Sequence, residues 1–70
     1  MGLGLALEIA GLLPDMIAAG MNVWNTVSRI KEINAAETAP GSSERATLEA
    51  AIAAAEADFE RLKLPRPPGT

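Results

Sequence analysis

Polar residues recur every seven positions through the otherwise apolar first half of the chain. On a helix of about 3.6 residues per turn they lie along one narrow face, while most of the remaining circumference is Leu, Ile, Met, Val, Ala and Trp. A helix with so wide an apolar surface is not stable alone in water. The pattern therefore predicts a helix covered by a second helix, by copies of itself, by a larger assembly or by lipid. The members of this polar stripe are Glu8, Asp15, Asn22 and Arg29.

Residues 1–37 are predicted to form this first helix, because large apolar residues recur along it at spacings of four and three. Over residues 1–10, however, large apolar residues also alternate strictly with small or polar ones, which is typical of a strand. For these first residues an extended arm docked on a neighbour is the alternative. Pro14 removes one helical hydrogen bond and clashes with the carbonyl of Ala10, so we expect a kink near residues 10–14 or a break into two helices.

The clearest loop in the chain is predicted at residues 38–43, where Pro40 and Gly41 interrupt the helical pattern. Ser42 or Ser43 is expected to cap the helix that follows. That second helix is predicted over residues 44–64, with apolar residues spaced as in the packing seam between two helices. The seam consists of Leu48, Ile52, Ala55, Phe59 and Leu62.

The last predicted segment is a Pro-rich tail at residues 65–70, which Pro65 separates from the second helix. Two helices joined by a short turn are expected to pack antiparallel. The predicted fold is therefore all-α: a two-helix antiparallel hairpin with a kinked first helix. One seam on the second helix is too narrow to cover the apolar surface of the first, so we expect oligomerisation or docking in a larger assembly to stabilise the hairpin.

Composition supports association and excludes several chemistries. A single core in a chain of 70 residues rarely supplies more than about 3–5 kcal/mol, and a chain without cysteine has no disulfide to add. The absence of histidine removes the commonest metal ligand and general base, and no phosphate loop or paired carboxylates are visible. We expect no enzyme activity, no catalytic residue, no metal and no cofactor. The net charge of −3, without a basic cluster, argues against nucleic acid as the main partner.

The partner is therefore predicted to be a second copy of the chain or a larger protein assembly. The function expected from this is that of a non-enzymatic structural subunit that buries its apolar helix face. A standard interface buries about 800 Å² per chain. The residues predicted to form the interface are Leu5, Ile9, Leu12, Met16, Ile17, Val23, Trp24 and Val27.

Two alternatives have different partners. Residues 1–28 are long and apolar enough to cross a bilayer, although Glu8 and Asp15 make insertion costly. A holin-like, pore-forming membrane oligomer with Glu8, Asp15 and Asn22 facing its lumen is the first alternative. A small inhibitor that binds a host protein is the second. The same residues 1–28 contain no Lys or Arg, so they lack the basic start of a secretory signal and favour cytoplasmic synthesis.

The plan of the whole chain resembles small helical-hairpin proteins from the structural and lysis regions of phage genomes. The resemblance is carried by the apolar, Gly- and Ala-rich first segment, by the turn Thr-Ala-Pro-Gly-Ser-Ser-Glu-Arg, and by the Ala-rich second helix Leu-Glu-Ala-Ala-Ile-Ala-Ala-Ala-Glu-Ala-Asp-Phe-Glu-Arg-Leu. It implies a virion component or a membrane-active accessory protein. It assigns no role to any individual residue.

Overall fold

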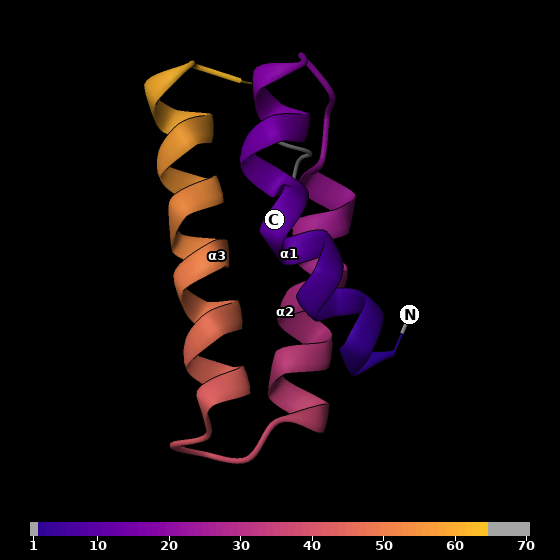
Figure 1. Ribbon diagram of the computed structural model, residues 1–70. Helices are drawn as coiled ribbons and strands as arrows, with labels where there is room; N and C mark the ends of the chain where they lie inside the picture. Colours follow the sequence, from indigo (N-terminus) through magenta and orange to yellow (C-terminus); the bar gives the residue numbers. More distant parts are fainter. Residues whose placement is uncertain (1, 65–70) are drawn as a thin grey trace.

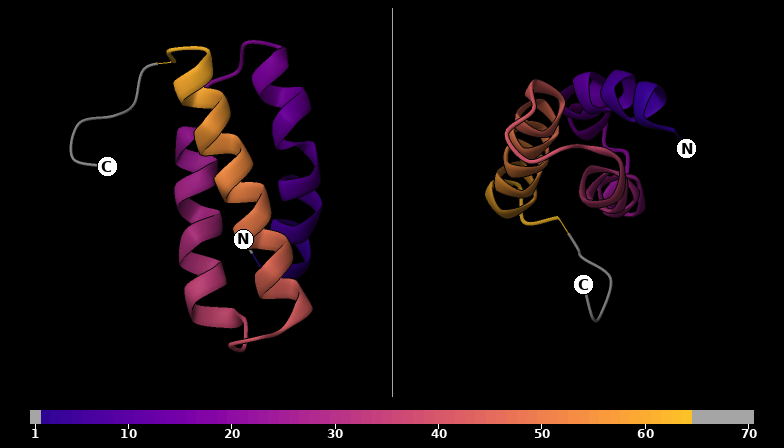
Figure 2. Two further views of the ribbon diagram at one scale, coloured as in Figure 1. Left: turned by 90° about the vertical axis from the view of Figure 1, so that its left-hand side faces the viewer. Right: turned by 90° about the horizontal axis from the view of Figure 1, so that it is seen from below.

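Three helices pack side by side around a single core in the computed structural model, which describes residues 2–64 (Figure 1). They are α1 (Leu3–Ala18), α2 (Trp24–Glu37) and α3 (Ser43–Arg61). α1 and α3 run in the same general direction and α2 runs opposite to both (Figure 1; Figure 2). The prediction of an all-α protein is confirmed, and the prediction of a two-helix hairpin is wrong. The predicted tail, residues 65–70, lies outside the described residues.

The helix predicted over residues 1–37 is divided at Gly20. α1 ends at Ala18, and Gly20 adopts a left-handed conformation with φ of +84°, which an L side chain tolerates poorly. The Gly20 N–H donates to the Ile17 carbonyl and the Met21 N–H donates to the Met16 carbonyl, each at 3.0 Å. These two bonds form the Schellman arrangement that closes a helix C-terminus. The chain therefore reverses here and starts a separate helix.

Pro14 does not break α1 into two helices, which is one of the two outcomes expected near residues 10–14. It lies inside the helix and on its exposed side, and α1 continues for one further turn to Ala18. One proline removes a single backbone hydrogen bond. The packing of Leu13 and Ile17 in the core holds the helix together across this position.

The start of α2 is held by Asn22, whose side-chain oxygen accepts a hydrogen bond from the Trp24 N–H at 3.1 Å. Asn22 stands one position before the N-cap residue Val23, and a bond from its side chain to the backbone two residues further on is the Asx turn that Asn commonly forms. Gly20, which closes α1, and Asn22, which accepts the hydrogen bond from the first residue of α2, stand only two positions apart. Together they account for the sharp turn between α1 and α2.

The turn between α2 and α3 lies where the sequence predicts it. Gly41 has φ of +79°, and the Ser42 hydroxyl accepts a hydrogen bond from the Arg45 N–H at 3.2 Å, which confirms the predicted N-cap. Arg45 also reaches back to the end of α2. Its Nε donates to the Thr38 hydroxyl at 3.0 Å, and its Nη2 donates to the Thr38 carbonyl at 3.0 Å and to the Asn34 carbonyl at 3.3 Å. One side chain thus joins the C-terminus of α2 to the first turn of α3.

All three helices contribute to the core. α1 brings small residues, Ala6 and Ala10, which are buried and allow a close approach of its neighbours. The ring of Trp24 at the start of α2 meets the ring of Phe59 near the end of α3 edge to face, with ring centroids 5.1 Å apart. The largest fully buried side chains are Phe59, Leu13, Ile30, Leu48, Val23 and Val27.

The helix of the predicted seam is shorter than expected. α3 ends at Arg61, and four of the five predicted seam residues are buried, whereas Leu62 is 44% exposed. Lys63 has φ of +54° and Leu64 donates its N–H to the Phe59 carbonyl at 2.9 Å. This is the same arrangement that closes α1 at Gly20. Because the helix ends here, Leu62 does not take the buried position that a continued helix would give it.

Candidate interaction surface

The polar stripe of the sequence is not a single face of the folded chain. Its four members are exposed, but Glu8 and Asp15 lie on α1, Asn22 lies in the turn, and Arg29 lies on the antiparallel α2. The reversal at Gly20 separates the acidic half of the stripe from Arg29. What remains on α1 is an acidic edge, Glu8 and Asp15, at a spacing of seven residues.

The structure divides the predicted interface residues into two groups. Ile17, Val23, Trp24 and Val27 are buried within the single chain, and Trp24 retains only 3% exposure. Leu5 and Leu12 are 50% and 53% exposed, while Ile9 and Met16 are half-buried and pack against the core from its edge. We call this second group, Leu5, Ile9, Leu12 and Met16, the outer α1 face.

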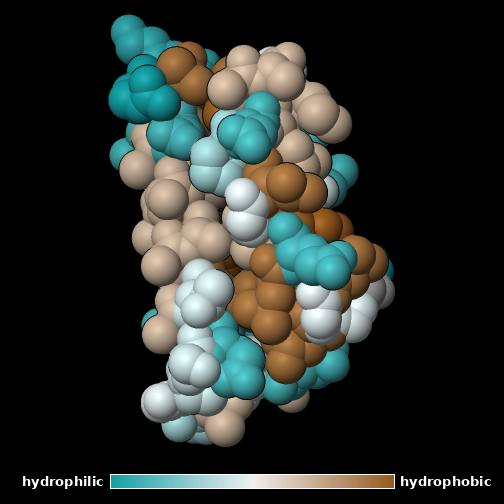
Figure 3. Space-filling view, viewed as in Figure 1, coloured by the Kyte–Doolittle hydropathy of each residue, from teal (hydrophilic) through white to brown (hydrophobic). Residues whose placement is uncertain are grey.

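The outer α1 face belongs to a larger apolar surface. Figure 3 shows hydrophobic side chains gathered over α1 in the centre of the molecule, beside the paler, alanine-rich surface of α3. Hydrophilic side chains, drawn in teal, border and interrupt the brown region (Figure 3). An exposed apolar region bordered by polar groups is typical of a protein-binding surface.

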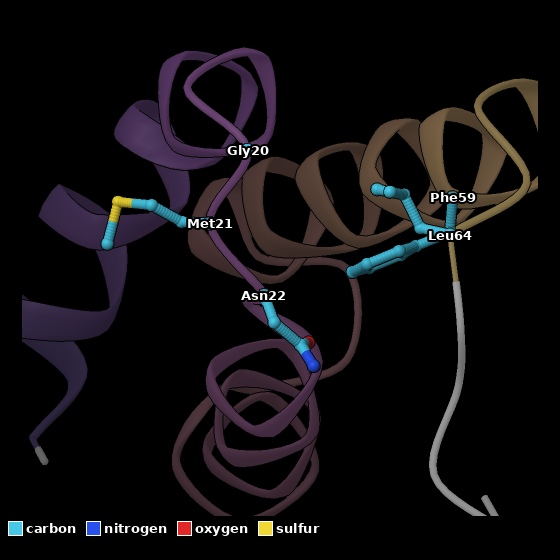
Figure 4. A pocket seen from close by; sticks show the side chains of 5 residues that line it. All are labelled: Gly20, Met21, Asn22, Phe59 and Leu64. Carbon is cyan, nitrogen blue, oxygen red and sulfur yellow. The ribbon is translucent and has the colours of Figure 1, made fainter.

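A hollow of about 150 Å³ opens at one end of the bundle, between the turn after α1 and the end of α3. Its lining is mainly apolar, and Asn22 is the polar side chain that borders it. In Figure 4 the ring of Phe59 points toward the turn, whereas the side chain of Met21 points away from Phe59 and Leu64. The hollow has room for a single apolar side chain. The lining residues are Gly20, Met21, Asn22, Phe59 and Leu64.

Two further exposed apolar residues lie near this end, Met21 at 51% exposure and Leu62 at 44%. The sequence places both on helices, where their spacing suggests packing. Each follows the last turn of a helix instead, because the chain adopts a left-handed conformation next to it at Gly20 and Lys63. Gly20 is a sequence signal for the first of these ends.

Charged side chains on α2 and α3 serve the packing of the bundle. Lys31 on α2 pairs with Glu56 on α3 at 2.9 Å, and its ammonium also lies 5.4 Å from the centre of the Trp24 ring. Arg61 pairs with Asp58 at 2.9 Å within α3. Residues 2–64 contain no group of three or more His, Cys, Asp or Glu placed to hold a metal ion.

No helix within residues 2–64 combines the length and the apolar character needed to cross a bilayer. No known protein family, curated protein or solved structure matches the chain.

Proposed function

We propose that this protein is a non-enzymatic interaction subunit that docks the outer α1 face against another protein chain. One observation carries the proposal. The bundle closes its core without Leu5 and Leu12, yet both leucines stand about half exposed on one side of a single helix. Neither leucine belongs to the core or to the half-buried apolar residues that pack against it.

The energetics favour burial of this face. Covering the exposed half of a leucine contributes on the order of 1 kcal/mol, and the outer α1 face offers two such leucines together with the edges of Ile9 and Met16. A standard interface of about 800 Å² per partner would use roughly a fifth of the 4305 Å² surface of the chain. The face and the residues beside it provide the centre of such an interface, where apolar side chains contribute most to affinity.

The proposal rests on this face and on no resemblance. The similarity to phage helical-hairpin proteins depends on a two-helix plan, whereas residues 2–64 form three helices. We infer the class of partner from the apolar and acidic side chains of α1.

Site-specific photo-cross-linking in cells that make the protein tests the proposal. With a photoreactive phenylalanine at Leu5, we expect a discrete adduct of higher mass, and we expect Leu12→Asp to reduce its yield at least tenfold because a carboxylate then stands in the docking face. Ala53→Asp on the exposed side of α3 is the matched control and should leave the adduct unchanged. An adduct equally strong with Leu12→Asp, or none at Leu5, would contradict the proposal.

A further inference from the structure

The outer α1 face has the register of a coiled-coil seam. Its four residues follow one another at spacings of four, three and four. In a heptad written abcdefg, Ile9 and Met16 take position a and Leu5 and Leu12 take position d. A partner helix packs on such a seam through apolar residues with the same repeat. The face therefore fits one helix more closely than a broad, flat surface.

The two flanks of this seam differ. On one flank, Ala6 and Leu13 take position e, and both are buried in the core of the bundle. On the other flank, Glu8 and Asp15 take position g and are exposed. Neither acid belongs to the ion pairs Lys31–Glu56 and Arg61–Asp58. A helix lying on the seam thus meets the bundle on one side and two carboxylates on the other.

A second copy of α1 does not complement this seam. In a parallel pair each g residue faces an e residue of the partner, but the e residues are inside the bundle. In an antiparallel pair g faces g, which brings Glu8 of one copy toward Asp15 of the other. Like charges at such positions are unfavourable, and no basic residue of α1 offsets them, since α1 has none.

We propose that the occupant of the outer α1 face is a single amphipathic helix of a different protein, with apolar residues in the same heptad repeat and Lys or Arg opposite Glu8 and Asp15. This inference rests on the docking function proposed above and specifies the chemistry of its partner. The apolar seam supplies contact area, and the acidic edge sets the orientation and the choice of partner, as e and g residues do in coiled coils.

Two synthetic helices of three heptads serve as probes. Both have Ile and Leu at positions a and d, and they differ only in carrying Lys or Glu at positions e and g. We expect the Lys helix to bind the intact protein about tenfold more tightly than the Glu helix, since two favourable pairs replace two repulsive ones. Titration calorimetry at low ionic strength measures both affinities, and the difference should shrink as salt is added.

Charge reversal on the protein localises the effect. Glu8→Lys with Asp15→Lys should invert the preference, so that the Glu helix binds more tightly. Glu32→Lys with Glu49→Lys changes the net charge equally at exposed positions of α2 and α3 and should leave the preference for the Lys helix intact. Circular dichroism confirms that each variant folds. If both double variants lose the preference for the Lys helix equally, the Lys helix responds only to the net charge of the protein. That result would overturn the inference.

The remaining outcomes separate this inference from the proposed function. If neither helix binds when it is present at 100-fold the protein concentration, or if both bind equally, the inferred partner chemistry is wrong. The docking function is then still tested independently by the cross-link at Leu5. If light scattering shows a dimer that Leu12→Asp converts to a monomer, the occupant is a second copy, which overturns the inference and supports docking.

Discussion

Lys63 is the one residue other than glycine among residues 2–64 with a positive φ, at +54°. It occupies the position after the last turn of α3 where glycine is preferred, because a side chain with a Cβ costs roughly 1 kcal/mol or more in the left-handed region. The hydrogen bond from the Leu64 N–H to the Phe59 carbonyl holds it there. The end of α3 is thus fixed by packing and hydrogen bonding against a local conformational cost.

Lys63→Gly is therefore expected to raise the free energy of unfolding by about 0.5–1 kcal/mol, since glycine adopts this conformation without a steric penalty. Lys63→Ala retains the Cβ and is the matched control, with no gain expected. Urea titration followed by circular dichroism measures both. A larger gain from alanine than from glycine would show that the lysine side chain, and not the backbone, governs this end of the helix.

At the scale of elements, two glycines of the first segment have opposite roles. Gly11 lies within α1, and a Cβ added there would meet nothing within 4 Å. Gly20 ends α1 with φ of +84°. The same substitution should consequently act in opposite directions at the two sites, because only one of them requires the freedom of glycine.

Gly11→Ala is expected to stabilise the fold by about 0.5–1 kcal/mol through helix propensity, and Gly20→Ala to destabilise it by about 1 kcal/mol through strain in the left-handed region. Thermal unfolding of the two variants beside the original protein measures both shifts. Destabilisation by Gly11→Ala would mean that α1 is packed more tightly at this point than the open space around Gly11 indicates.

These elements also show what the sequence can predict. The start of α3 was predictable because Pro40, Gly41 and Ser42 mark it with three local signals. Apolar periodicity does not reveal the division of the first helix. Apolar residues continue at helical spacing from Met16 through Ala19 to Val23, across the turn that separates α1 from α2. The local signals, Gly20 followed by Asn22, carry the physical cause of the break. Pro14 is the more familiar helix breaker but lies where packing overrides it.

The candidate interaction surface could be predicted only in part from the sequence. Apolar periodicity identifies residues that pack, but it does not distinguish packing within the chain from packing between chains. The sequence pattern leaves two roles open for Trp24, an interface anchor or a contact with Phe59 or Leu48 on the helix predicted at residues 44–64, and the predicted interface uses the first together with Val23 and Val27. The break at Gly20 places Val23, Trp24 and Val27 at the start of a separate helix, and all three share one core with Phe59 and Leu48. Only Leu5, Ile9, Leu12 and Met16 keep the predicted role as a proposal.

For the whole molecule, the single chain closes its own core. Residues of all three helices share one core, in which Leu48 is fully buried, whereas Leu12 on the outer α1 face is exposed to solvent over half of its surface. Oligomerisation is therefore not required to cover the core, in contrast to the hairpin expected from the sequence. Substitutions on the outer α1 face can therefore impair docking without unfolding the bundle.

Leu48→Ala is expected to cost about 2–4 kcal/mol, most of the stability of a domain this small, whereas Leu12→Ala should change the free energy of unfolding by less than about 0.5 kcal/mol. Thermal melts followed by circular dichroism compare the two leucine variants. The melting temperature of the original protein should also be independent of its concentration. A midpoint that rises with concentration would indicate that the fold depends on self-association.

The edge-to-face contact between Trp24 and Phe59 gives the molecule a built-in optical reporter. Trp24 is the only tryptophan in the chain and is buried among residues of the core, so its emission should shift to longer wavelength only when the bundle opens. Leu5 and Leu12, where we place the partner, belong to the exposed side of a different helix. Intrinsic fluorescence therefore follows unfolding while remaining silent to docking, and a partner without tryptophan can be titrated against a constant signal.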